Sequence, residues 1–113
     1  MTNRPIPVEQ ANAMISEYIS YMEKLGVDMA KQTQSVSFTS KEFYTWLTSV
    51  MQYMDELRVC IGVYPDGTSS GRITTILWPY KDGKPARKPK VEGKGGGDDD
   101  EDVEPYNDGH TTP

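Results

Sequence analysis

The feature that most constrains the fold is a pair of strand-like segments, residues 57–64 and 73–80, with a turn-rich link between them. In the first segment apolar residues occupy every second position, which is typical of a strand because successive side chains point to opposite faces. The second segment is rich in Ile, Thr and aromatic residues, which favour strands. Pro65 presets φ for a turn and Gly67 supplies a positive φ, so the link is a loop. The sequence therefore predicts a β-hairpin.

The two predicted strands differ in the faces that they must bury. The first strand is apolar on one face, which we expect to be buried. That face consists of Leu57, Val59, Ile61 and Val63. The second strand is apolar on both faces and needs a packed layer on each side. Its apolar side chains are Ile73 and Leu77 on one face and Ile76, Trp78 and Tyr80 on the other. The helices can supply one layer, so the other must come from the connector, the tail or another chain.

Two amphipathic helices are predicted before the hairpin. Apolar residues recur at alternating steps of three and four from Val8 to Leu25, which is typical of a helix with one apolar face. Gly26 is suited to end this helix, because glycine readily adopts the left-handed conformation that follows many helices. Thr39 and Glu42 match a capping box, in which each side chain bonds a free backbone N–H, so a second helix is expected to begin there.

These elements predict an α+β domain in residues 1–86. The expected order is helix, strand, helix, strand, strand, and residues 35–38 form the short first strand. Both helices are expected to pack on the small antiparallel sheet. Residues 87–113 are expected to be a disordered tail, first basic and then acidic, because a glycine run followed by an acidic run cannot pack a core.

The net charge of −5 combines blocks of opposite sign. Residues 1–80 carry six basic and eight acidic residues, residues 81–94 carry six basic and two acidic residues, and residues 95–113 carry seven acidic residues and no basic ones. The basic block could lie along phosphates, but the acidic block beside it would compete for the same positive charges. We therefore do not expect nucleic-acid binding.

Three motifs resemble those of a diffuse group of small uncharacterised bacterial proteins. The motifs are the first helix, the segment VSFTSKEFYTWL, and LRVCIGVYPDG followed by GRITTILWPYKDGKPA. The group shares a helix, a second helix that begins in the same way, a strand and a closing turn. The resemblance covers roughly residues 8–86 and implies a helix and β-hairpin fold. No activity and no functional residues are known in the group to carry over.

The sequence carries none of the motifs that would indicate an enzyme or a metal site. One cysteine, Cys60, and one histidine, His110, cannot fill the four positions of a zinc site within one chain. Cys60 lies inside a strand, and we expect it to be a small buried apolar residue. The acidic run lacks the spacing of an EF-hand, and the glycine run lacks the lysine of a phosphate loop. We predict no enzymatic activity and no cofactor.

The cellular location of the chain is predicted from two kinds of segment that its sequence lacks. No apolar run is long enough to span a membrane, so no membrane association is expected. The N-terminal residues have no apolar segment of the kind found in secretory signals, which favours the cytoplasm.

We therefore predict a protein-interaction or self-assembling module, because a unit of about 80 residues with no disulfide or metal has a marginal core of its own. A homo-oligomer, most simply a dimer, is expected, although a different protein partner stays possible. Large aromatic and aliphatic side chains are candidates for the interface, where such residues are enriched. They are Trp46, Tyr53, Ile76, Trp78 and Tyr80.

The alternative prediction is a small regulatory or inhibitor-like protein whose acidic tail engages a basic surface, for example that of a nucleic-acid enzyme. The candidate tail contacts are Lys84, Arg87, Lys88, Lys90, Asp98, Asp99, Asp100, Glu101 and Asp102. Deletion of residues 87–113 separates the two hypotheses, because self-association should survive it and inhibition should not.

Overall fold

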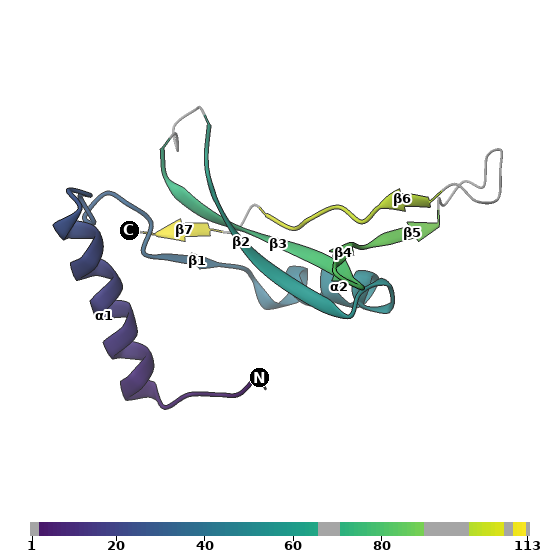
Figure 1. Cartoon of the computed structure of the whole chain (residues 1–113), viewed down its shortest axis with the longest axis horizontal. Coiled ribbons are helices and arrows are strands. Elements are labelled where there is room, and N and C mark those ends of the chain that lie inside the picture. The colour runs from purple at the N-terminus through teal and green to yellow at the C-terminus, as the bar shows by residue number, and fades with distance from the viewer. Residues whose placement is uncertain (1–2, 66–70, 90–99, 108–109, 113) are drawn as a thin grey trace.

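The computed structural model describes residues 3–65, 71–89, 100–107 and 110–112, and within them the chain is α+β with small antiparallel sheets, as predicted (Figure 1). The helices are α1 (Val8–Lys24), α2 (Ser40–Val50) and the 3₁₀ helix η1 (Met51–Tyr53). The strands are β1 (Ser35–Ser37), β2 (Glu56–Val63), β3 (Ile73–Lys81), β4 (Lys84–Pro85), β5 (Arg87–Pro89), β6 (Asp100–Asp102) and β7 (His110–Thr112).

The predicted hairpin is formed by β2 and β3. Its antiparallel register runs from the Glu56 and Tyr80 pair to the Val63 and Ile73 pair. The predicted turn residues 66–70 lie outside the described residues. After β3 the chain reverses at Asp82 and Gly83, both with positive φ, and β4 pairs back on β3. The sheet order is therefore β2-β3-β4.

The described C-terminal residues are part of the fold. β6 pairs with β5, β7 pairs with β1, and the Val103 N–H donates a 3.0 Å hydrogen bond to the Ala86 carbonyl. Tyr106 and Leu77 exchange two backbone hydrogen bonds of 2.8 and 2.9 Å. The prediction of a disordered tail is therefore wrong for residues 87–89, 100–107 and 110–112. The other tail residues between 90 and 113 lie outside the described part, and a domain boundary at residue 86 stays a prediction.

Aromatic and aliphatic anchors within the tail explain this pairing. Val103 is buried with Val50 and Ala86, and Trp46, Tyr53 and Met54 pack against that cluster. The ring of Tyr106 stacks on Trp46 at 4.6 Å between centroids and lies 5.3 Å from the Phe38 ring. The composition predicts a solvated segment, whereas Val103 and Tyr106 of the acidic tail pack against apolar residues of the rest of the chain.

Only one of the two helices packs as expected. α2 contributes Val50 and Trp46 to the core cluster, but α1 has no buried residue among the described ones. α1 extends from the rest of the molecule beside β1, as Figure 1 shows. The expectation that both helices pack on the sheet is therefore wrong for α1, whereas α2 packs against Ala86 and Val103, which follow β4 and β6. Among the described residues, no element packs closely enough on the apolar face of α1 to bury any of its side chains.

The ends of the helices follow the sequence signals closely. α1 ends at Lys24, and Gly26 has a φ of 91°, as expected for a residue that terminates a helix. α2 follows Thr39, which is its N-cap residue, as predicted. The capping interaction differs, because the Thr39 hydroxyl bonds the Glu42 carboxylate and no side chain bonds the free backbone N–H groups.

Tyr106→Ala should destabilise the fold by about 2 kcal/mol, roughly half the cost of truncating a fully buried large aromatic side chain, because Tyr106 is half-buried. Urea unfolding followed by tryptophan fluorescence measures this change. Tyr44→Ala is the matched control, since Tyr44 is 68% exposed on α2 and should change stability by less than about 0.5 kcal/mol. Equal midpoints for the two variants would contradict the placement of Tyr106.

Candidate functional site

The apolar face of β2 is exposed. Val59, Ile61 and Val63 are 61, 69 and 58% exposed. Their cross-strand neighbours on β3 are Leu77, Thr75 and Ile73. The sequence predicts that this face is buried, and the structure contradicts that expectation. Alternation identifies the residues that share a face, whereas cover depends on a helix, and α1 does not lie over this face (Figure 1).

The apolar side of α1 is also exposed. Val8, Ile15 and Leu25 are each more than half exposed, and Tyr18 and Met22 belong to the same seam. The regular spacing of apolar residues in this helix is a packing pattern. In the part of the chain that the structure describes, two apolar faces are thus exposed, one on α1 and one on the hairpin.

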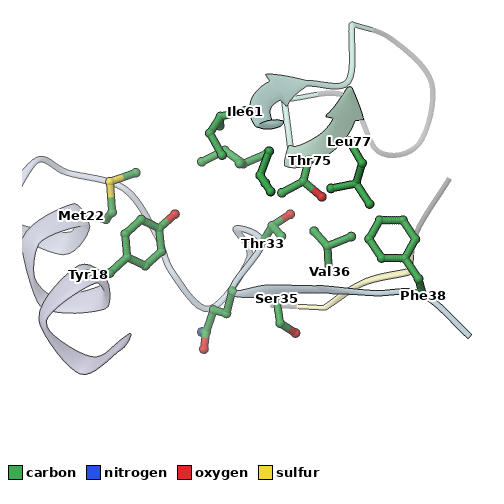
Figure 2. Close-up of a pocket in the computed structure, with 12 residues that line it drawn as sticks. Tyr18, Met22, Thr33, Ser35, Val36, Phe38, Ile61, Thr75 and Leu77 are labelled. Atoms are coloured by element: carbon green, nitrogen blue, oxygen red, sulfur yellow. The ribbon is translucent and has the colours of Figure 1, made fainter. Parts of the chain in front are cut away.

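A groove of about 600 Å³ separates these two faces, and its lining is mostly apolar (Figure 2). Tyr18 and Met22 of α1 form one wall, β1 contributes Val36, and the hairpin contributes Ile61 and other side chains. The remaining lining residues are Thr33, Gln34, Ser35, Phe38, Val59, Ile73, Thr75 and Leu77. We name the exposed face of β2 together with this lining the open apolar groove.

Gln32 fixes the hairpin relative to the segment before β1. Its side-chain oxygen accepts hydrogen bonds from the backbone N–H groups of Ile73, at 2.6 Å, and Thr33, at 2.9 Å. Its side-chain amide donates to the Gly71 carbonyl at 3.1 Å. These bonds join the hairpin to the segment before β1, so the sides of the groove that these two segments form keep their separation.

Thr33 places a polar group in this apolar setting. The residue is buried, and its hydroxyl oxygen has no hydrogen-bond partner among the described residues. A buried hydroxyl without a partner costs free energy because it has lost its bond to water.

One edge of the hairpin sheet is open. β3 is flanked by β2 on one side and by β4 and the Tyr106 bridge on the other, whereas β2 pairs with β3 alone among the described strands. The backbone groups of Leu77 bond Tyr106 and therefore point away from Val59, its partner on β2. By the alternation of antiparallel pairing, the backbone groups of Val59 point away from β3 as well. The residues of the exposed apolar face thus also present the free backbone groups of the edge.

The predicted interface residues divide between two environments. Trp46 and Tyr53 pack against the core cluster. Ile76, Trp78 and Tyr80 lie on the other face of β3, half-buried, with the Trp78 and Tyr80 rings edge to face at 6.2 Å and the Arg58 guanidinium 3.9 Å from the centre of the Tyr80 ring. None of these five residues lines the open apolar groove. Their role in an interface stays a prediction.

The predicted tail contacts pair with one another where they are described. Arg87 and Asp102 form an ion pair at 2.7 Å, and Lys88 and Glu101 approach to 3.9 Å. The Asp100 carbonyl accepts a hydrogen bond from Arg87, while Lys84 is exposed in β4. Lys90, Asp98 and Asp99 lie outside the described residues.

The remaining predictions for the described residues concern Cys60, metal ligands and membrane spans. Cys60 is half-buried rather than buried, which corrects the expectation for this side chain. No group of three or more His, Cys, Asp and Glu residues there is arranged to hold a metal ion. No described helix combines the length and the apolar character needed to cross a bilayer.

Comparisons with known proteins add no relative. No family model, curated protein or solved structure matches the chain. The resemblance to the small bacterial proteins therefore stays a prediction.

The residues that build the open apolar groove from outside the hairpin are not predicted from the sequence. The seam of α1 was visible in the spacing, but its exposure was not, because helical periodicity does not indicate which surface covers it. Gln32 and Thr33 lie in a connector with no periodic pattern, so no sequence signal was available for them.

Thr33→Val should leave stability unchanged or raise it by about 1 kcal/mol, because it replaces a buried hydroxyl without a partner by a methyl group of similar size. The midpoint of urea unfolding measures the change. Thr33→Ser is the control, since it keeps the hydroxyl and removes the methyl group, and it should destabilise. A Thr33→Val variant less stable than Thr33→Ser would show that the hydroxyl is satisfied.

Proposed function

We propose that this protein is a non-enzymatic interaction module that associates with copies of itself through the open apolar groove, most simply as a two-fold dimer. The observation that carries the proposal is the exposure of the row Val59, Ile61 and Val63 at a groove whose facing helix is also uncovered.

Hydrophobic burial supports this proposal. Contiguous exposed apolar surface is uncommon on monomeric proteins and marks interaction sites. The buried core of the described residues is small, with Val50, Ala86 and Val103 as its central cluster. Chains of this size commonly obtain the stability that such a core lacks from disulfides, metals or oligomerisation. Two-fold association is the commonest form of oligomerisation.

The alternative, an acidic tail that engages a basic partner, has less support. The ion pair of Arg87 with Asp102, and the contact of Lys88 with Glu101, place basic and acidic residues of the tail against each other. A basic partner would have to displace these internal contacts. Exposed ion pairs are weak, so displacement is feasible, but no described feature favours it over the apolar association.

Ile61→Thr should weaken self-association at least about tenfold, because each of the two copies then buries less apolar surface. Thr keeps the β-branched shape that suits a strand, so the free chain should stay folded. Sedimentation velocity and native mass spectrometry of the full chain, from about 1 to 100 μM, give the dissociation constants.

Tyr44→Gln is the matched control, since Tyr44 is a comparably exposed apolar residue outside the groove. It should associate like the wild type. A wild-type chain that stays monomeric over the whole range, or an Ile61→Thr variant that associates as tightly as the wild type, would overturn the proposal.

A further inference from the structure

We infer that two copies of this chain pair antiparallel along β2, with the two Cys60 residues facing each other at the two-fold axis. This inference rests on the proposed self-association and assigns it an interface and a register. It predicts that β2 and its copy join the two hairpins into one continuous sheet.

The open edge of β2 supplies the hydrogen-bonding groups for this pairing. Leu57, Val59, Ile61 and Val63 alternate with residues bonded to β3, so their N–H and C=O groups point outward. The other side of the sheet is not available in the same way, because β4 and the Tyr106 bridge cover much of the β3 edge. Among the described strands, β2 is therefore the one beside which a second strand can be added along the full hairpin.

β2 also lacks the devices that normally protect an edge strand. Proteins prevent unwanted pairing with lysine, proline, bulges or very short edges. β2 has eight residues, pairs with β3 without an interruption in register, and contains no lysine or proline. From Val59 to Val63 it carries no charge at all. These properties favour the pairing of the β2 edge with another strand.

One register lets the whole strand pair with its own copy. A two-fold axis at Cys60 places Val59 opposite Ile61 and Leu57 opposite Val63, so apolar side chains meet along the exposed face. These are the residues with outward backbone groups, so the hydrogen bonds and the apolar contacts form in the same register. An axis at Arg58 would instead place two arginines opposite each other and shorten the overlap.

The face of β2 that carries Arg58, Cys60 and Gly62 fits this register as well. Arg58 faces Gly62 of the second copy, so the arginine meets no side chain there and stays over the Tyr80 ring. Cys60 and Gly62 are small, and Ile76 of the same chain already covers Gly62, because its Cδ1 would lie 3.2 Å from a Cβ placed there.

The sheet would extend towards α1. In Figure 2, Ile61 lies between Thr75 and the α1 side chains Tyr18 and Met22. A strand added beside β2 therefore enters the mouth of the open apolar groove. Its apolar face would then lie near the apolar side of α1, a helix with no buried residue among the described ones.

Disulfide crosslinking of the full chain tests the register. Facing residues at a pair without hydrogen bonds have Cα atoms about 4.5 Å apart, within the range that a disulfide spans. With diamide as the oxidant, which takes up the two electrons and two protons of the thiols, Cys60 should form a covalent dimer. Non-reducing electrophoresis and intact mass measure the rate.

The matched control is Cys60→Ala combined with Val63→Cys. Val63 is exposed on the same strand, but in this register it faces Leu57 of the second copy and lies about 20 Å from its own counterpart. It should crosslink at least about tenfold more slowly than Cys60, because its effective concentration is far lower.

Sedimentation of the reduced proteins separates the two possible failures. A non-covalent dimer in which Cys60 crosslinks no faster than the Val63→Cys variant would overturn the register and leave the proposed self-association standing. A monomer at about 100 μM would overturn both. A dimer with fast Cys60 and slow Val63→Cys crosslinking would support both.

Discussion

The backbone pair between Tyr106 and Leu77 determines which surfaces of this protein are covered. It uses the outer backbone groups at the middle of β3, so that among the described residues the hairpin keeps one open edge, that of β2. It also positions the Tyr106 ring on Trp46 and near Phe38, which joins α2 to the end of the groove. The same C-terminal segment therefore completes the core at one end of the hairpin and leaves the other strand free to pair.

Local signals in the sequence predicted the elements well. Alternation identified β2 and β3, steps of three and four identified α1, and Gly26 and Thr39 marked helix ends that the structure confirms. These signals succeed because they depend on backbone geometry and on neighbours within a few residues. They carry no information about which element comes to lie over a given face.

The errors share that cause. The sequence indicated that Val59, Ile61 and Val63 share a face, but their burial depended on α1, which lies to one side. The acidic composition around residue 101 predicted a solvated tail, whereas Val103 and Tyr106 bring two apolar anchors back to the core. The average polarity of a charged segment does not reveal the single apolar residues within it. Long-range pairing, such as that of β1 with β7, has no local sequence pattern.

The free chain and its proposed dimer differ mainly in what happens to the row Val59, Ile61 and Val63. In the free chain these side chains face water, so they contribute little to the free energy of folding despite their large apolar surface. Pairing would place them against apolar side chains of the second copy at the same time as the outward backbone groups of β2 gain hydrogen bonds. The strand β2 would then contribute to both folding and association. The stability of such a protein depends on its concentration, because association removes folded monomer from the unfolding equilibrium.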